Sequence, residues 1–180
     1  MRSRDAQESP ASADQAAAVL KQAPRKPGLV VFDLDYTLWP YWCEMMSPKD
    51  DPYLFPEARG VMQALENENI PMAIASRTPT PKTAVAFLQK LGLTNKFVST
   101  QLIPAHGGFD MSGAPKDKYH LPNIMKETGI PYSEMIFFDD ESPNIQKVSR
   151  LGVCSILVAT STGVSVKELK RALDQFGTHK

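Results

Sequence analysis

The protein has 180 residues, 42% of them apolar, and its 20 basic and 20 acidic side chains give a formal net charge of zero. This length favours one domain with a substantial core. The balanced charge disfavours a nucleic-acid binder, which needs a concentrated basic face. No run of 18 apolar residues occurs, so we predict no membrane span. Two cysteines, Cys43 and Cys154, are too few for a disulfide framework and lack metal-ligand spacing, so we expect a reduced, cytoplasmic protein.

The first 27 residues differ in composition from the rest. They are rich in Ala, Ser, Gln and Pro and contain no aromatic residue, so we predict a disordered tail at 1–27 and a single domain at 28–180. Three acidic residues disfavour an organelle transit peptide. A short helix over residues 14–22 is compatible with the sequence, but nothing obvious follows for it to pack against.

Regular apolar runs begin after this segment. Runs that do not alternate with polar residues are typical of strands buried on both faces. Four such runs are Leu29–Phe32, Met72–Ala75, Met135–Phe138 and Ser155–Val158, and Phe97–Val98 is a weaker fifth candidate.

Segments with helical spacing separate these runs. They begin after Pro56, at Thr80–Pro81, ahead of Leu121, at Ser142–Pro143 and at the capping-box sequence Ser165–Glu168. Alternating strands and helices imply right-handed βαβ units and a parallel sheet. We therefore predict a three-layer, Rossmann-like α/β sandwich with about five parallel strands.

Carboxylates, a hydroxyl and a guanidinium directly follow three of the predicted strands. These residues are Asp33, Asp35, Ser76, Arg77, Asp139 and Asp140. Ligands of open parallel sheets bind outside the carboxyl ends of the strands. Carboxylates gathered there would repel by roughly 4 kcal/mol per close pair in a partly screened site, unless a cation neutralises them. Oxygen ligands without His or Cys suit Mg²⁺.

The spacing of the first two carboxylates indicates phosphoryl transfer. Alternate residues of an extended segment point the same way. Asp33 can therefore attack phosphorus to form an aspartyl phosphate, while Asp35 protonates the leaving oxygen and later activates water. Ser76 and Arg77 can bind the phosphoryl oxygens and the substrate.

Four motifs together resemble those of the haloacid dehalogenase superfamily. They are Val-Val-Phe-Asp33-Leu-Asp35-Tyr-Thr37-Leu38, Ala-Ser76-Arg77-Thr78, Lys118 and Phe-Phe-Asp139-Asp140-Glu141. The series Asp-Leu-Asp-Tyr-Thr-Leu-Trp39-Pro40 is similar, more narrowly, to the eukaryotic magnesium-dependent phosphatase family. The resemblance covers residues 29–176.

The resemblance implies Mg²⁺-dependent hydrolysis of phosphomonoesters. Asp33 would be the nucleophile and Asp35 the acid/base. Asp33, Asp140 and the Asp35 carbonyl would bind the metal, with Asp139 in support. Substrate would contact Ser76, Arg77, Thr37 and the motif lysine. The substrates and partners implied are phosphotyrosine-like groups, phosphoproteins and sugar phosphates, including phosphorylated glycation products.

Two lysines compete for the third motif. In the family this lysine lies three residues before a histidine, but here Asp117 has that spacing from His120. An alignment from Pro115 selects Lys118 as the catalytic lysine, which would stabilise the charge of the transition state. Lys116 is the alternative.

The intervals between motifs are filled by the predicted helices and strands, so we expect no cap domain and an open site. The glycine-rich excursion at 107–113 is interpreted as a hairpin or loop. The aromatic segment Leu38–Trp42 either forms a wall for the leaving group or seals the core. Cys43 is expected to be inert, and the three histidines, His106, His120 and His179, are expected in surface or capping roles.

Two other hypotheses use the same residue types. A receiver-type signalling domain also has a phosphoaccepting Asp, but its acidic pair follows the first strand and its acceptor the third, the reverse of the order here. A catalytically silent scaffold would have lost one of the catalytic positions, all of which are filled. The sequence predicts no oligomeric state.

Overall fold

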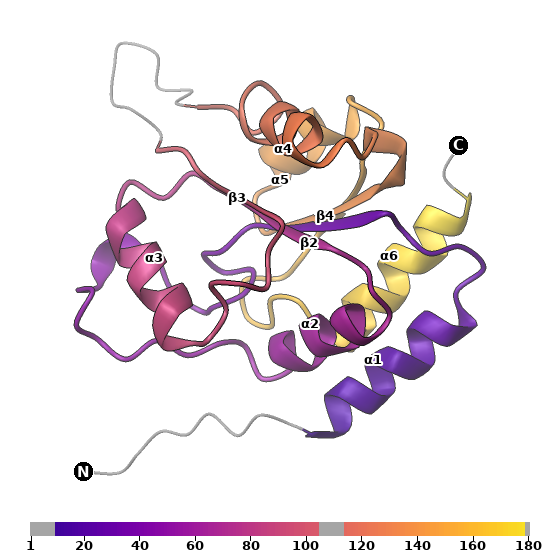
Figure 1. The fold of residues 1–180 in the computed structure, drawn as a ribbon, viewed down its shortest axis with the longest axis horizontal. Helices are drawn as coiled ribbons and strands as arrows, with labels where there is room; N and C mark the ends of the chain where they lie inside the picture. Colours follow the sequence, from indigo (N-terminus) through magenta and orange to yellow (C-terminus); the bar gives the residue numbers. More distant parts are fainter. Residues whose placement is uncertain (1–9, 105–113, 179–180) are drawn as a thin grey trace.

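A five-stranded parallel sheet forms the centre of the protein (Figure 1), in a computed structural model that describes residues 10–104 and 114–178. Its strands are β1 (Leu29–Phe32), β2 (Met72–Ser76), β3 (Ser99–Leu102), β4 (Met135–Asp139) and β5 (Cys154–Leu157). Their order across the sheet is β3-β2-β1-β4-β5, with every neighbouring pair parallel. The predicted strand number and direction are confirmed.

The fifth strand was predicted slightly too early in the chain. β3 begins at Ser99, directly after the predicted Phe97–Val98 pair, and Val98 is exposed. β3 is an edge strand in which the first and third residues are buried and the second is exposed. Its sequence is therefore largely polar, and an apolar run does not mark it.

Helices cover both faces of the sheet and confirm the three layers. On one side lie α2 (Ala58–Asn67), α3 (Pro81–Lys90) and α6 (Val166–Thr178), and on the other lie α4 (His120–Thr128) and α5 (Ser142–Ser149) (Figure 1). The central strand supplies both cores because its side chains alternate: Val30 and Phe32 join the first, and Leu29 and Val31 the second. Two 3₁₀ turns, η1 (Cys43–Met45) and η2 (Tyr132–Glu134), complete the elements.

The predicted helix ends are largely confirmed. The Ser165 hydroxyl accepts a hydrogen bond from the Glu168 N–H at 3.3 Å, as a capping box requires. Gly92 follows α3 with a φ of 69°, a left-handed conformation that favours glycine. Thr80 precedes α3, but its hydroxyl lies 3.3 Å from that of Thr78 and caps no helical N–H.

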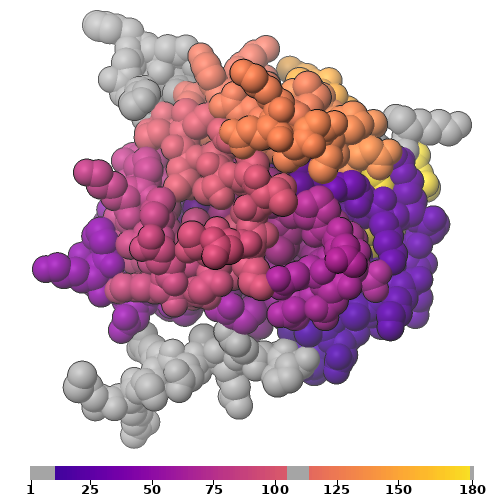
Figure 2. Space-filling view, in the orientation of Figure 1, coloured from indigo at the N-terminus to yellow at the C-terminus, as the bar shows by residue number. Residues whose placement is uncertain are grey.

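An additional helix, α1 (Pro10–Gln22), corrects the prediction that residues 1–27 are disordered. It packs against α2 and α6, and Figure 2 shows its indigo residues as part of the continuous surface. Ala16 and Leu20, one helical turn apart, are fully buried. A Cβ added at Gly60 of α2 would lie 2.0 Å from the Ser12 hydroxyl, so the two helices approach closely there. Residues 1–9 lie outside the described part.

The link after α1 is also anchored. The Arg25 guanidinium lies 4.4 Å from the centre of the Phe176 ring, and Arg25 also pairs with Glu134. Lys26 pairs with Glu68. Composition predicted disorder in this segment because Ala16 and Leu20, the two fully buried apolar residues of α1, are a weak apolar signal. The residues that they pack against are far away in the sequence.

Within residues 10–104 and 114–178, no domain is inserted over the carboxyl edge of the sheet, as the prediction of no cap requires. The predicted loop at 107–113 lies outside the described residues, as do His106 and His179. None of the described helices has the length and apolarity needed to cross a membrane.

Candidate active site

The loops that follow β1, β2 and β4 enclose a cavity of about 430 Å³ at the carboxyl edge of the sheet. Its lining includes five of the six residues that the sequence placed at strand ends, namely Asp33, Asp35, Ser76, Arg77 and Asp140, together with Lys116. Parallel strands bring these segments together because all their carboxyl ends lie on one edge.

Lys116 occupies the position that the sequence analysis assigned to Lys118. The Lys116 ammonium lies 2.6 Å from Asp33 Oδ1 and 2.6 Å from Asp139 Oδ2, and Lys116 is only 2% exposed. Lys118 has a 72% exposed side chain whose ammonium lies 3.8 Å from Asp117. The structure therefore places Lys116, and not Lys118, beside Asp33 and Asp139. The turn after Pro115 directs the first lysine inward and the second into solvent.

Asp139 is fully buried and surrounded by donors. Its Oδ1 accepts the Glu141 N–H at 2.7 Å, and its Oδ2 accepts the Lys116 ammonium. The Asn144 amide lies 3.2 and 3.1 Å from these two oxygens and 2.7 Å from Glu141 Oε2. Sequence reasoning missed Asn144, which is buried in the first turn of α5. The only available signal was a polar residue directly after Ser142–Pro143.

Three carboxylates fit a divalent cation. Asp33, Asp139 and Asp140 each offer an oxygen, and these oxygens lie within 4.8 Å of one another. Burial, and secondarily Asp139 and Glu141, raises the pKa of Asp140 to about 6. Burial also raises the pKa of Asp33, against the lowering effect of Lys116. The single ammonium of Lys116 therefore leaves part of the negative charge of these carboxylates uncompensated. A donor set made only of oxygens suits Mg²⁺.

Asp35 is held by the loop that follows it. The Trp39 indole N–H donates to Asp35 Oδ1 at 2.6 Å, and the Cys43 N–H donates to the same oxygen at 3.2 Å. Tyr36 turns the chain there with a φ of 52°, in the left-handed region. Burial raises the pKa of Asp35, while these hydrogen bonds lower it less. Among the described residues, the Asp35 carboxylate is outside the three-carboxylate group.

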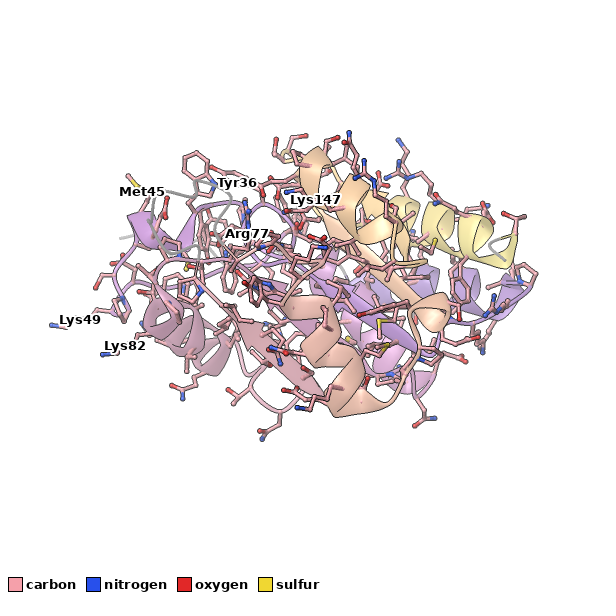
Figure 3. All side chains as sticks on the ribbon, turned by 90° about the horizontal axis from the view of Figure 1, so that it is seen from above. Tyr36, Met45, Lys49, Arg77, Lys82 and Lys147 are labelled. Atoms are coloured by element: carbon pink, nitrogen blue, oxygen red, sulfur yellow. The ribbon has the colours of Figure 1, made fainter. Side chains whose placement is uncertain are left out.

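The β2 loop adds the remaining polar groups. The Ser76 hydroxyl accepts the Thr78 N–H at 3.3 Å, and the Arg77 guanidinium donates to Glu141 at 2.9 Å across the cavity. Figure 3 shows Arg77 and Tyr36 in the same part of the molecule. Arg77 is thus paired with a carboxylate from the β4 loop.

The position of Thr37 does not match its predicted role in substrate binding. It is fully buried, does not line the cavity, and its hydroxyl has no hydrogen-bond partner among the described residues. The Thr37 carbonyl accepts the Val164 N–H at 2.9 Å. Thr37 therefore lies beneath the β1 loop and supports it.

The aromatic segment Leu38–Trp42 was predicted either to form a wall for the leaving group or to seal the core, and its residues divide between the core and the cavity lining. Trp39 is fully buried, stacks on Tyr41 and meets the edge of Phe87, so it belongs to the core. Trp42 is 55% exposed, lines the cavity and meets Tyr36 edge-to-face at 5.6 Å between ring centres.

Two other side chains near the cavity are buried. The Cys43 thiol lies 3.0 Å from the Thr78 hydroxyl, and burial raises the pKa of Cys43, as expected for an inert thiol. His120 has neither the predicted surface position nor a capping role, because the start of α4 has no side-chain cap. It is fully buried, with Nε2 2.9 Å from the Ser76 carbonyl oxygen.

Sequence comparisons identify relatives of this chain. Residues 25–179 match the model of a family described as Acid Phosphatase. The chain is 35% identical over 169 residues to human "Magnesium-dependent phosphatase 1", covering 84% of this chain and 88% of that protein. It is 40% identical over 146 residues to a HAD-like hydrolase superfamily protein of Schizosaccharomyces pombe, covering 71% and 83% of the two chains.

Solved structures show the same fold at low identity. A HAD-superfamily hydrolase from Ehrlichia chaffeensis is 16% identical with a TM-score of 0.63, covering 84% of this chain and 98% of its own. An uncharacterised protein from Listeria monocytogenes is 14% identical with a TM-score of 0.65, covering 83% and 98%.

Proposed function

We propose that this chain, which belongs to the acid phosphatase family and has the haloacid dehalogenase fold, hydrolyses phosphomonoesters with Mg²⁺ through an aspartyl phosphate on Asp33. The observation that carries the proposal is the placement of Lys116 between Asp33 and Asp139 in a cavity that Asp35, Ser76 and Asp140 also line. Burying a lysine with two carboxylates carries a desolvation penalty, so we attribute the arrangement to function and not to stability.

The first step is attack by the free oxygen of Asp33 on phosphorus. The new oxygen–phosphorus bond forms as the bond to the leaving oxygen breaks, and Asp35 donates a proton to that oxygen. A water molecule then gives a proton to Asp35 and attacks the phosphorus, which releases phosphate and regenerates Asp33. Trp39 and the Cys43 N–H occupy one oxygen of Asp35, which leaves the other for the proton.

Other residues bind the phosphoryl group. Burial alone would lower the pKa of Lys116, but Asp139 and Asp33 outweigh it and raise that pKa, so Lys116 remains an ammonium. It holds Asp33 in place and can contact a phosphoryl oxygen together with Ser76. Mg²⁺ held by Asp33, Asp140 and the Asp35 carbonyl, near Asp139, would supply the positive charge that lets a dianion approach Asp33.

We place the leaving group against Trp42 and Arg77 at the open mouth. The exposed indole offers a flat apolar surface, and Arg77 offers a cation if it leaves Glu141. This combination supports phosphotyrosine-like, protein-linked or sugar-phosphate substrates, with phosphorylated small molecules or phosphoproteins as partners. The cytoplasm is our proposed compartment, on cysteine usage alone.

The decisive experiment is a screen of phosphorylated metabolites, phosphopeptides and glycated phospho-compounds, with Mg²⁺ and with EDTA. We expect hydrolysis with Mg²⁺ that stops in EDTA and returns when Mg²⁺ is restored. Beryllium fluoride, which mimics a phosphoryl group, is expected to form an adduct on Asp33. Activity that EDTA leaves unchanged, or an adduct on another residue, would contradict the mechanism. A stable phosphoprotein without turnover would favour the receiver-like hypothesis.

A further inference from the structure

His120 connects two parts of the candidate site without lining the cavity. It is the first residue of α4, and its ring is fully buried. Nε2 lies 2.9 Å from the carbonyl oxygen of Ser76, the last residue of β2. A carbonyl only accepts, so Nε2 carries the proton in this hydrogen bond. Burial lowers the pKa of His120 to about 4, so the ring is neutral near pH 7.

The Ser76 carbonyl is a fixed point of the phosphate-binding loop. It accepts a second hydrogen bond from the Ile103 N–H at 3.1 Å. The hydroxyl of the same residue accepts the Thr78 N–H at 3.3 Å, which orders the following turn. A displacement of this carbonyl would therefore move the hydroxyl that we place on the phosphoryl group.

The other end of the connection is the turn that carries Lys116. The Leu121 N–H donates to the Lys116 carbonyl at 2.9 Å, and the Tyr119 N–H donates to the Pro115 carbonyl at 3.1 Å. These bonds join the lysine backbone to the first turn of α4. His120 belongs to that turn, so its ring ties the lysine segment to β2 across 44 residues of chain.

We infer that His120 is a positioning residue that sets the Lys116 ammonium relative to the Ser76–Thr78 loop; this inference rests on the proposed phosphatase function. Lys116 has to contact Asp33 and a phosphoryl oxygen that Ser76 also binds. A lysine stem has several rotatable bonds, so its ammonium is placed accurately only if its backbone is fixed. The imidazole supplies that anchor at hydrogen-bond distance.

The test compares His120→Leu, which removes the donor, with His120→Gln, whose amide can still donate to the Ser76 carbonyl. We expect kcat to fall about 10- to 100-fold in the leucine variant, because small misplacements of active-site groups cause losses of this size. In the glutamine variant kcat should recover in part. Ile124→Val is the matched control, since it removes a buried methyl group from the same helix and leaves both partners of the His120–Ser76 hydrogen bond unchanged. It should keep wild-type kcat. Wild-type kcat in His120→Leu, an equal loss in Ile124→Val, or no recovery in His120→Gln overturns the inference.

A double-mutant cycle separates positioning from general damage to the fold. If His120 acts through Lys116, adding His120→Leu to Lys116→Ala should lower kcat by less than about threefold further, because neighbouring residues that act together are not additive. Independent, fully additive losses would overturn the inference.

Binding of inorganic phosphate, measured by calorimetry with Mg²⁺ present, needs no turnover. We expect affinity to fall at least about fivefold in His120→Leu and less in His120→Gln. A wild-type protein that hydrolyses no phosphomonoester would defeat the proposed function, and phosphate affinity would then decide the role of His120. Equal affinity in the wild type and both variants would exclude that role.

Discussion

The ammonium of Lys116 lies 2.6 Å from Oδ1 of Asp33, although 83 residues of chain separate them. Asp139 Oδ2, on the neighbouring strand, lies at the same distance from the ammonium. A single cation therefore joins the β1 and β4 loops at the point where we place the nucleophile. This geometry makes the two nearby lysines experimentally distinguishable.

Lys116→Ala is expected to lower kcat by about 10²- to 10³-fold, the usual cost of losing one electrostatic contact to a transition state. Lys118→Ala should stay within about twofold of wild type, because its side chain is largely in solvent. Steady-state kinetics on one phosphomonoester checks both variants. A larger loss in Lys118→Ala would restore the assignment that the sequence favoured.

Asp33→Asn should abolish turnover and raise the free energy of unfolding in EDTA, because burial raises the folded-state pKa of Asp33 and ionisation at pH 7 therefore opposes folding. Urea denaturation measures the gain. Asp174→Asn, at an exposed site on α6, is the control and should change stability little. Loss of stability in Asp33→Asn would mean that the Lys116 contact outweighs burial.

Mg²⁺ affinity should weaken as the pH falls. The pKa of Asp140 is about 6 without metal, so a proton must leave before the carboxylate can bind an ion at lower pH. Asp140 alone gives a loss of about fourfold between pH 7.5 and 5.5, and the raised pKa of Asp33 acts in the same direction. Calorimetric titration at the two pH values checks this. Affinity independent of pH would show that Asp140 is no ligand.

Acid should destabilise the wild type more than His120→Gln. The unfolded chain binds a proton on His120 near pH 6.5, whereas the folded state binds it only near pH 4. Lowering the pH through this interval therefore favours unfolding, by up to about 3 kcal/mol for this residue. Urea midpoints of both proteins from pH 7 to 4.5 give the difference, in which the carboxylates common to both cancel. Parallel curves would contradict the burial of a neutral ring.

Removing the buried face of α1 should cost stability. Leu20→Ala is expected to lower the free energy of unfolding by about 2–4 kcal/mol, because Leu20 is fully buried where α1 packs. The control Leu157→Ala removes a side chain that is 41% exposed and should cost less. Chemical denaturation measures both. An unaffected Leu20→Ala variant would mean that α1 does not contribute to the folded state.

Much of the fold could be predicted because its signals are local. Runs such as Met72–Ala75 lie on a strand buried on both faces, and the caps at Gly92 and Ser165 depend on neighbouring residues only. The edge strand β3 was predicted two residues too early, because exposure on one face makes its sequence polar. The site residues at strand ends were found for a related reason: a parallel sheet brings those ends to one edge whatever the loops do.

Residue types and their order along the chain by themselves determined the α/β class and the convergence of Asp33, Asp35, Ser76 and Asp140 on one cavity. Tertiary structure alone decided that Lys116 turns inward, that His120 is buried and that α1 folds onto α2 and α6. Each of these depends on a contact between segments far apart in the chain. A local pattern cannot specify which of two lysines, two positions apart, a distant carboxylate will contact.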